Sequence, residues 1–254
     1  MDTILEVKKL SKQFYKNKKL FTAVNAISFT LQRGECLGIV GESGCGKSTT
    51  VKMITHLLKP DGGDIFLNGT DIQKLRGKSL KQLCTQIQMV FQVPQDSFDP
   101  RQTLGKSIME SMRNHGAGKK EAKKRLGELL QQVELPAEIA DRYPNQVSGG
   151  QCQRAAIARA LAVNPKILIC DEATSALDVT VQAQIVQLLK RLKKEMDLSI
   201  LLISHDLALV QDLCDHVIVM YQGNIVEEGT PERVINAPEN GCTKMLIEAA
   251  MLGQ

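Results

Sequence analysis

The sequence predicts an α/β fold organised around a parallel core sheet, and three observations predict it. The apolar run Cys36–Val40 has the length of a buried strand, and a glycine-rich turn and a helical pattern follow it directly. Two further apolar runs, Lys166–Cys170 and Leu198–Ile203, end at polar residues and are separated by an amphipathic helical stripe. Buried strands that alternate with such helices are typical of parallel sheets covered by helices.

The bulk properties limit the class of protein. At 254 residues the chain can bury a full core, and its net charge of +4 is too small to require nucleic acid as a partner. The 7 cysteines form no Cys-x-x-C pair and are odd in number, which argues against a disulfide framework and against a zinc or iron–sulfur site. No apolar run reaches the roughly 18 residues that a membrane span needs. The N-terminus does not have the pattern of a signal peptide.

The glycine-rich turn carries the most specific motif in the chain. Two glycines are separated by four residues and followed by Lys and Ser, a pattern that cradles phosphate groups. Glycines let backbone N–H groups approach a polyphosphate, and the start of the next helix favours an anion. Lys47 is expected to neutralise the β- and γ-phosphates of a nucleotide, and Ser48 to hold Mg²⁺. The flanking strand and helix disfavour an accidental turn. The predicted nucleotide-binding residues here are Gly41, Ser43, Gly44, Cys45, Gly46, Lys47, Ser48 and Thr49.

Residues 3–35 are predicted to form strands and turns of a small sheet. Ile4–Lys8 and Ala26–Leu31 are the candidate strands, and Phe14 and Tyr15 lie between them. An aromatic ring here can stack on a nucleobase. Ordinary packing on the small sheet is the alternative.

The middle of the chain combines one more strand with a helical insertion. Gln86–Phe91 is a predicted strand, and Gln92 follows it in a loop, where it can reach a metal or a water or simply be a loop residue. Residues 97–145 are polar and helix-prone, which predicts a helical insertion. Its apolar helical face comprises Ala122, Leu126, Leu129, Leu130 and Val133.

A second glycine-containing turn follows the insertion. Ser148 is expected to cap a helix that runs to Ala162. Gly149 and Gly150 at the start of this helix make a second nest suited to an anion. A plain N-cap with a glycine turn is the alternative.

Polar side chains follow the two later strands of the core. Asp171 and Glu172 close the first of these strands, at the sheet edge where open α/β sheets bind ligands. Asp171 is expected to hold Mg²⁺ through water, and Glu172 to polarise an attacking water. His205 follows the second strand and can contact a γ-phosphate, although a lone His is more often structural. Val217–Met220 is the last clear strand, and residues 230–254 are predicted to form a helical tail.

The order of these motifs resembles the nucleotide-binding subunit of ATP-binding-cassette (ABC) transporters over nearly the whole chain. This subunit is a P-loop NTPase with a parallel core sheet, an antiparallel β subdomain and a helical subdomain. The corresponding segments are Gly41 to Thr49 for the first nucleotide motif, Gln92 for the Q-loop, Ser148 to Gln151 for the signature, Ile167 to Glu172 for the second motif, Ser175 to Asp178 for the D-loop, His205 for the switch histidine, and Phe14, or else Tyr15, for the adenine-stacking aromatic.

The resemblance implies a role for each of these residues. Glu172, His205 and Gln92 would be catalytic, and Ser48, Gln92 and Asp171 would hold Mg²⁺. Phe14 and the glycine-rich segment would bind ATP in one subunit. A second subunit, placed head to tail, would cover that ATP with its own copies of Ser148, Gly149, Gly150, Gln151 and Asp178.

The resemblance also implies an organisation and a set of partners. The whole chain, 1–254, would be one ATP-binding domain, with its core at about 1–92 and 163–230, a helical subdomain at about 93–162 and a C-terminal helical tail at about 231–254. The segments Val-Gly-Glu-Ser-Gly-Cys-Gly-Lys-Ser and Met-Val-Phe-Gln…Phe-Asp-Pro-Arg are similar to the dipeptide, oligopeptide and nickel importer branch. Val147, where Leu is usual, and Asn240 to Cys242 depart from its pattern.

The partners implied are a second ATP-binding subunit, identical or paralogous, two transmembrane permease subunits and an extracytoplasmic substrate-binding protein, without nucleic acid. The chain would then lie at the cytoplasmic face of the membrane as a peripheral ATPase that energises import of peptides, nickel or metal chelates. The alternative function is a soluble ABC ATPase of an assembly machinery, of the iron–sulfur type.

Overall fold

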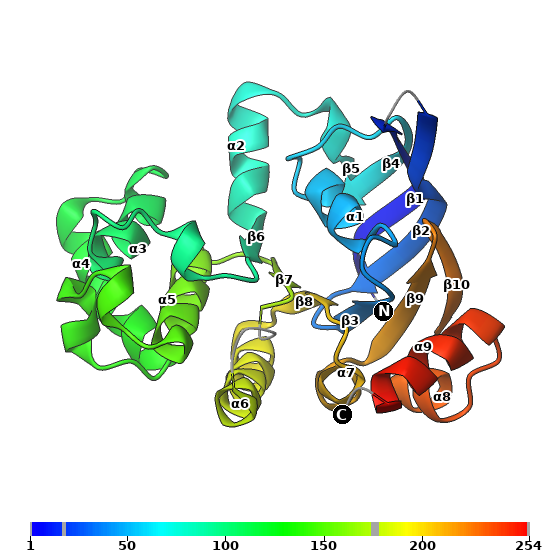
Figure 1. Ribbon diagram of the computed structural model, residues 1–254. Coiled ribbons are helices and arrows are strands. Elements are labelled where there is room, and N and C mark those ends of the chain that lie inside the picture. Colours follow the sequence, from blue (N-terminus) through cyan, green and yellow to red (C-terminus); the bar gives the residue numbers. More distant parts are fainter. Residues whose placement is uncertain (1, 17–18, 174–177, 253–254) are drawn as a thin grey trace. The chain divides into compact units, whose positions relative to one another are not determined.

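The computed structural model describes residues 2–16, 19–173 and 178–252 (Figure 1). The chain forms two compact units. Unit 1 comprises Met1–Cys84 and Ser199–Gln254, and unit 2 comprises Thr85–Leu198. Each unit is described by itself below. The prediction of one domain with a core and a helical subdomain at residues 93–162 stays a prediction.

Unit 1 contains an antiparallel sheet in the order β2-β1-β4-β5, and the strands β10, β9, β3 and β8, which are neighbours in that order. Its elements are β1 (Thr3–Lys16), β2 (Lys19–Gln32), β3 (Cys36–Val40), α1 (Lys47–Ile54), β4 (Gly62–Leu67), β5 (Thr70–Asp71), a 3₁₀ turn (Ile72–Lys74), β8 (Ser199–Ile203), α7 (Leu207–Leu213), β9 (His216–Tyr221), β10 (Asn224–Gly229), α8 (Pro231–Asn236) and α9 (Gly241–Leu252).

Strand β3 is the centre of the parallel part of unit 1. All of its residues are buried, as the continuous apolar run predicts. It pairs in parallel with β8, where Ile39 lies opposite Ile203, and with β9, where Ile39 lies opposite Ile218. The expected fold class is therefore confirmed, since buried parallel strands occur beside an antiparallel sheet and covering helices.

Unit 1 contains more strand than the sequence analysis predicts, in its first two strands and after β9. The hairpin of β1 and β2 pairs almost to its tip, so Phe14 and Tyr15 lie within β1 rather than between strands. Strand β10 pairs antiparallel with β9, and the prediction that Val217–Met220 is the last strand is wrong. The missed strand has the sequence NIVEEG, whose adjacent charges hide the alternation that marks a half-buried strand.

Helix α1 is shorter than its apolar pattern suggests. The pattern continues to Leu57 and Leu58, but the helix ends at Ile54 and Leu57 is 66% exposed. The Thr55 hydroxyl donates to the carbonyl of Val51 at 2.9 Å. His56 then takes a left-handed backbone conformation with φ 62°, which stops the helix.

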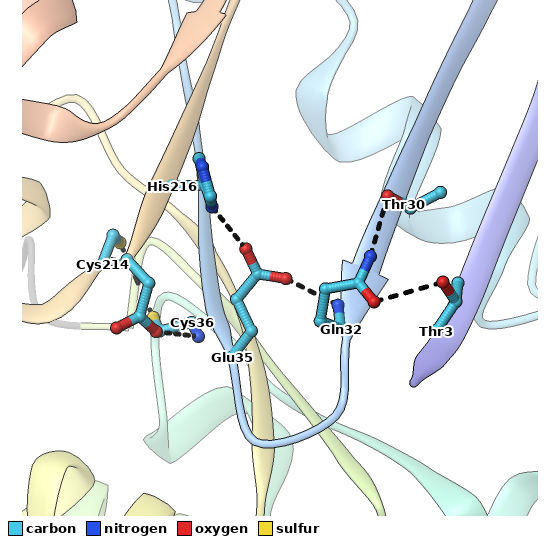
Figure 2. A network of polar contacts seen from close by, with 8 residues as sticks. Thr3, Thr30, Gln32, Glu35, Cys36, Cys214 and His216 are labelled. Carbon is cyan, nitrogen blue, oxygen red and sulfur yellow. Dashed lines mark hydrogen bonds and ion pairs between the residues drawn. The ribbon is translucent and has the colours of Figure 1, made fainter. Parts of the chain in front are cut away.

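The connection between β2 and β3 is fixed by a polar network (Figure 2). One oxygen of the Glu35 carboxylate accepts from the backbone N–H of Gln32 at 2.6 Å, and the other lies 2.8 Å from Nδ1 of His216 at the start of β9. The carboxylate of Asp215 accepts from the N–H of Cys36 at 2.7 Å. These bonds anchor the beginning of β3, and with it the strand that leads into the glycine-rich turn.

Unit 2 combines a pair of parallel strands with a group of helices. Its elements are β6 (Ile87–Val90), α3 (Leu104–Arg113), α4 (Lys119–Gln132), α5 (Gly149–Leu161), β7 (Ile167–Asp171), α6 (Val179–Met196) and 3₁₀ turns at Gln95–Ser97, Ala137–Asp141 and Pro144–Gln146, and α2 (Gly77–Gln86) crosses the boundary between the units.

The helical insertion is present, and the apolar face predicted for it is buried. Ala122, Leu129 and Val133 are fully buried at 0% exposure, and Leu126 and Leu130 are nearly so. Helix α2 was not anticipated by the sequence analysis. Among the described residues, no helix has both the length and the apolar composition that crossing a membrane requires.

Candidate functional site

In unit 1 the glycine-rich turn folds tightly between β3 and α1. Gly46 has φ 114°, and a Cβ on it would lie 2.3 Å from the carbonyl oxygen of Ala23 in β2. Only glycine fits there without displacing the backbone of β2. The turn is therefore a tight backbone cradle that packs directly against β2, with no room for a side chain at Gly46.

The side chain of Lys47 lies over this cradle. It is only 5% exposed, and its Nζ donates to the carbonyl oxygens of Gly41 at 2.6 Å and Glu42 at 2.9 Å. The Sγ of Cys45 is 3.8 Å from the same ammonium group. Helix α1 begins at Lys47 with Gly46 as its N-cap and no side-chain cap. The positive end of the helix dipole and a buried ammonium thus face the same turn, a combination that favours a bound anion.

His205 lies at the same sheet edge of unit 1. Because β3 and β8 run parallel and in register, the glycine-rich turn and His205 both follow the carboxyl ends of neighbouring strands. The N–H of Ser204 is 3.4 Å from the carbonyl of Ile39, which fixes this edge. Asp206 caps α7 by accepting from the N–H of Leu209 at 3.1 Å, so the exposed His205 sits on a defined turn.

Phe14 lies near the tip of the β1–β2 hairpin. It is 38% exposed, pairs across the strands with Phe21 and has Nζ of Lys12 5.5 Å from its ring centroid. Strand β2 continues from Phe21 to Ala23, whose carbonyl lies against the cradle at Gly46. Tyr15 is 82% exposed. An aromatic ring available for stacking is thus carried by the strand pair that contacts the glycine-rich turn.

In unit 2 the structure brings Gln92 and Glu172 together. Strands β6 and β7 are parallel, with Val90 opposite Cys170, so the residues after both strands meet at one edge. The Nε2 of Gln92 donates to the Glu172 carboxylate at 2.8 Å. Asp171 is the last residue of β7, directly before Glu172. A carboxylate pair and an amide thus share one strand edge.

The backbone of Glu172 is unusual. Its φ is +48°, in the left-handed region that a residue with a side chain seldom adopts. Such a conformation costs on the order of 1–3 kcal/mol and persists where the surroundings enforce it, often at functional sites. The left-handed backbone sets the direction in which the Glu172 side chain leaves β7.

The chemistry of the predicted ligands suits Mg²⁺ and a triphosphate in each unit taken by itself. In unit 2 the Asp171 carboxylate and the Gln92 amide oxygen are oxygen donors of the kind that Mg²⁺ prefers, and in unit 1 the Ser48 hydroxyl is another. The buried Lys47 ammonium and the uncapped start of α1 supply the positive charge that phosphate groups need.

The start of helix α5 is closed by a reciprocal capping box. The Oγ of Ser148 accepts from the N–H of Gln151 at 3.2 Å, and the Gln151 side chain accepts from the N–H of Ser148 at 3.0 Å. The first amides of any α-helix point out of its N-terminus without an intrahelical acceptor, and those of Gly149 and Gly150 have this position here. The box holds the turn in the geometry of an anion nest.

Asp178 caps the next helix of unit 2. Its side chain accepts from the N–H of Val181 at 3.0 Å and so starts α6. Of the predicted D-loop, Ser175 to Leu177 lie outside the described residues.

A buried arginine that the sequence analysis did not single out ties the segment after Gln92 to helix α5. Arg159 donates to the carbonyl and the hydroxyl of Ser97, and its guanidinium stacks 4.3 Å from the ring centroid of Phe98. Burial lowers the pKa of Arg159 below its ordinary value, and burial raises the pKa of the nearby Cys152 thiol to about 11. No sequence signal predicts this contact, because its partners are 62 residues apart.

A second clamp joins three helical segments of unit 2. The Glu134 carboxylate, just after α4, pairs with Arg154 of α5 at 2.7 Å and with Arg191 of α6 at 3.0 Å. The hydrogen bond from Arg154 holds the pKa of Glu134 below its ordinary value. The helix that begins with Ser148 is therefore held at several points along its length.

Comparison with known proteins agrees with the family that the sequence motifs indicate. The model of the ABC transporter family matches residues 24–175. The glutathione import ATP-binding protein GsiA of Pectobacterium atrosepticum is 48% identical over 228 residues, covering 89% of this chain and 37% of GsiA. The oligopeptide transport ATP-binding protein OppF of Salmonella typhimurium is 42% identical over 246 residues, covering 96% of this chain and 74% of OppF.

A solved structure of an ATP-binding cassette has a similar fold. The dimeric ATP-binding cassette MJ0796, bound to ADP and Pi, has a TM-score of 0.81 at 30% identity and covers 90% of this chain and 99% of its own. The chain spans little more than a third of GsiA, at 37%, and about three quarters of OppF, at 74%. The resemblance drawn from the motifs is confirmed, and this chain belongs to the ABC transporter family.

Proposed function

We propose that the chain binds and hydrolyses ATP and that this reaction powers the import of peptides. The observation that carries the proposal is the Gln92–Glu172 pair at the end of β6 and β7, in a chain that also holds a phosphate cradle with a buried Lys47. The cradle supplies binding of a triphosphate, and the carboxylate supplies the group that hydrolysis needs.

In this proposal each predicted site residue has its own part in binding the nucleotide. Lys47 neutralises the β- and γ-phosphates, and the amides at the start of α1 donate to their oxygens. Phe14 stacks on the adenine. Ser48, Gln92 and Asp171 hold Mg²⁺, which would neutralise charge that develops on the phosphates. The likeness to MJ0796, which is bound to ADP and Pi, supports a nucleotide in this position.

Glu172 and His205 carry the chemistry in this proposal. Glu172 orients and polarises the attacking water, and the hydrogen bond from Gln92 sets the direction of its carboxylate. The water attacks the γ-phosphorus, the bond to the bridging oxygen of ADP breaks, and inorganic phosphate leaves. His205 donates to the γ-phosphate and stabilises its charge.

A second ATP-binding subunit completes each site. The start of α5, with Ser148, Gly149 and Gly150, donates its outward amides to the γ-phosphate held by the partner subunit, and Gln151 keeps the turn closed. Asp178 lies at the same subunit interface. The dimeric state of MJ0796 supports this arrangement.

The relatives support a peptide as cargo. GsiA is named for the import of glutathione and OppF for the transport of oligopeptides, so a peptide is favoured over nickel or a metal chelate. The partners are then two permease subunits and an extracytoplasmic substrate-binding protein, with this chain at the cytoplasmic face of the membrane. The assembly-machinery ATPase is less well supported, because both named relatives are transport proteins.

Reconstitution tests the proposal. The chain is co-expressed with candidate permease subunits from the same genome, purified as a complex and placed in lipid vesicles with a candidate binding protein. We expect uptake of a labelled short peptide that requires ATP and is lost in Glu172→Gln. ATP hydrolysis with no uptake of glutathione, dipeptides or oligopeptides would support the proposed ATPase activity and reject peptides as the cargo.

A further inference from the structure

Helices α5 and α6 of unit 2 touch at their first turns through Gly150 and Val181. A Cβ placed on Gly150 would lie 2.6 Å from Cγ1 of Val181 and 3.7 Å from its Cβ. The shorter distance is below any normal contact between carbon atoms, so Val181 leaves no room for a methyl group at position 150. The second glycine of the Ser-Gly-Gly turn is thus a close-packing position between two helices.

Val181 cannot easily move out of the way. A β-branched residue in a helix has one strongly preferred χ1 rotamer, so its methyl groups keep a fixed direction. The main chain of Val181 is also fixed, because its N–H is bonded to the Asp178 side chain at 3.0 Å. Its Cγ1 therefore forms a rigid stop against which the first turn of α5 rests.

We infer that Val181 is a positioning residue for ATP hydrolysis, which sets where the amides of Gly149 and Gly150 point by packing on Gly150. This inference rests on the proposed function, in which those amides bind the partner subunit's γ-phosphate. Because Asp178 and Val181 start the same helix, a displacement of Asp178 moves the stop and so moves the turn. Val181 thus links Asp178, the last residue of the predicted D-loop, to the Ser148 turn of the same subunit.

Substitution of Gly150 by Ala, with and without truncation of Val181, tests the stop. Gly150→Ala should lower the rate of ATP hydrolysis by about 10- to 100-fold, because small misplacements of a positioning group cost this much. Gly150→Ala combined with Val181→Ala removes the clash and should be more active than Gly150→Ala alone, by about 10-fold. ATP affinity of the isolated subunit, measured with a fluorescent ATP analogue, should be the same in all variants, because its own phosphate cradle is unchanged.

The chain offers a matched control in Gly127 of helix α4. This glycine is also helical and exposed, and a Cβ on it would meet nothing within 4 Å. Gly127→Ala should leave both hydrolysis and ATP affinity unchanged. A loss of activity in Gly127→Ala equal to that in Gly150→Ala would reject the steric explanation.

The outcomes separate this inference from the proposed function. Ser148→Arg puts a bulky cation into the turn and should abolish hydrolysis if the turn serves the partner's nucleotide at all. Full activity of Ser148→Arg would overturn the proposed role of the turn. An inactive Ser148→Arg variant supports the role of the turn, and two results beside it would still reject the Val181 stop. The first is a fully active Gly150→Ala variant. The second is a Gly150→Ala variant that Val181→Ala fails to rescue.

Discussion

The amide of Gln92 donates a 2.8 Å hydrogen bond to the carboxylate of Glu172, across the ends of two parallel strands. The pair links the predicted Q-loop residue with the residue that is expected to activate water. The amide fixes the orientation of the carboxylate without neutralising its charge. A carboxylate in this state is suited to accept a proton from, or orient, an attacking water.

Replacing Glu172 by Gln should stop hydrolysis and leave ATP binding intact. The amide keeps the size of the side chain but cannot polarise water, so phosphate release should fall by about 10²- to 10⁴-fold. Release of inorganic phosphate and retention of bound ATP measure the two effects. Turnover at the normal rate would remove Glu172 from the mechanism.

Replacing Lys47 by Ala should weaken ATP binding. The variant removes a buried ammonium that bonds the loop carbonyls and is expected to neutralise the phosphates, and a charge-assisted contact contributes about 1.5–3 kcal/mol. Lys52, an exposed residue of the same helix, provides the control, and Lys52→Ala should bind ATP like the original chain. Equal affinities of Lys47→Ala and Lys52→Ala in equilibrium binding would contradict the assignment of the cradle.

Replacing Arg159 by Lys should destabilise unit 2. Lys cannot reproduce both the two bonds to Ser97 and the stack on Phe98, because it lacks the planar fork of the guanidinium. The expected loss in the free energy of unfolding is about 2 kcal/mol, measured by denaturant unfolding. Arg113, at the end of α3, offers an exposed arginine for comparison, and Arg113→Lys should be close to neutral. An equal and small effect at both positions would show that the Ser97 contact is not structural.

The Glu134 clamp should make stability depend on pH in the acid range. Arg154 holds the pKa of Glu134 below its ordinary value of 4.5, so the folded state binds this proton less readily than the unfolded state. The stabilisation is therefore complete above the unfolded pKa and is lost as pH falls through the lower folded value. Glu134→Gln should unfold more easily than the original chain at pH 7, and this difference should shrink as the pH falls below 4.5. A difference that does not change as the pH falls would rule out the carboxylate as its source.

The sequence predicts the elements that follow local rules. The strand Cys36–Val40, the Ser148 cap and the placement of Asp171 and Glu172 after a buried strand all depend on runs of neighbouring residues, and the structure contains them. The capping box at Ser148 needs only the residue three positions later, so a short window is sufficient.

Features that depend on distant partners could not be predicted in this way. The stack of Arg159 on Phe98 and the contact of Val181 with Gly150 join segments far apart in the chain, and neither leaves a periodic pattern. The early end of α1 depends on one left-handed residue, His56, which has no clear sequence signal. The left-handed backbone of Glu172 is likewise visible only in the structure.

The account's central claim is that the cradle of one subunit and the Ser148 turn of the other enclose the same nucleotide. A cryo-electron microscopy structure of the Glu172→Gln transporter with magnesium and ATP measures this directly. We predict that the Gly149 and Gly150 amides of one subunit lie within hydrogen-bonding distance of the γ-phosphate that the other subunit's Lys47 holds. A nucleotide-loaded complex in which the Ser148 turn contacts no phosphate would contradict the account.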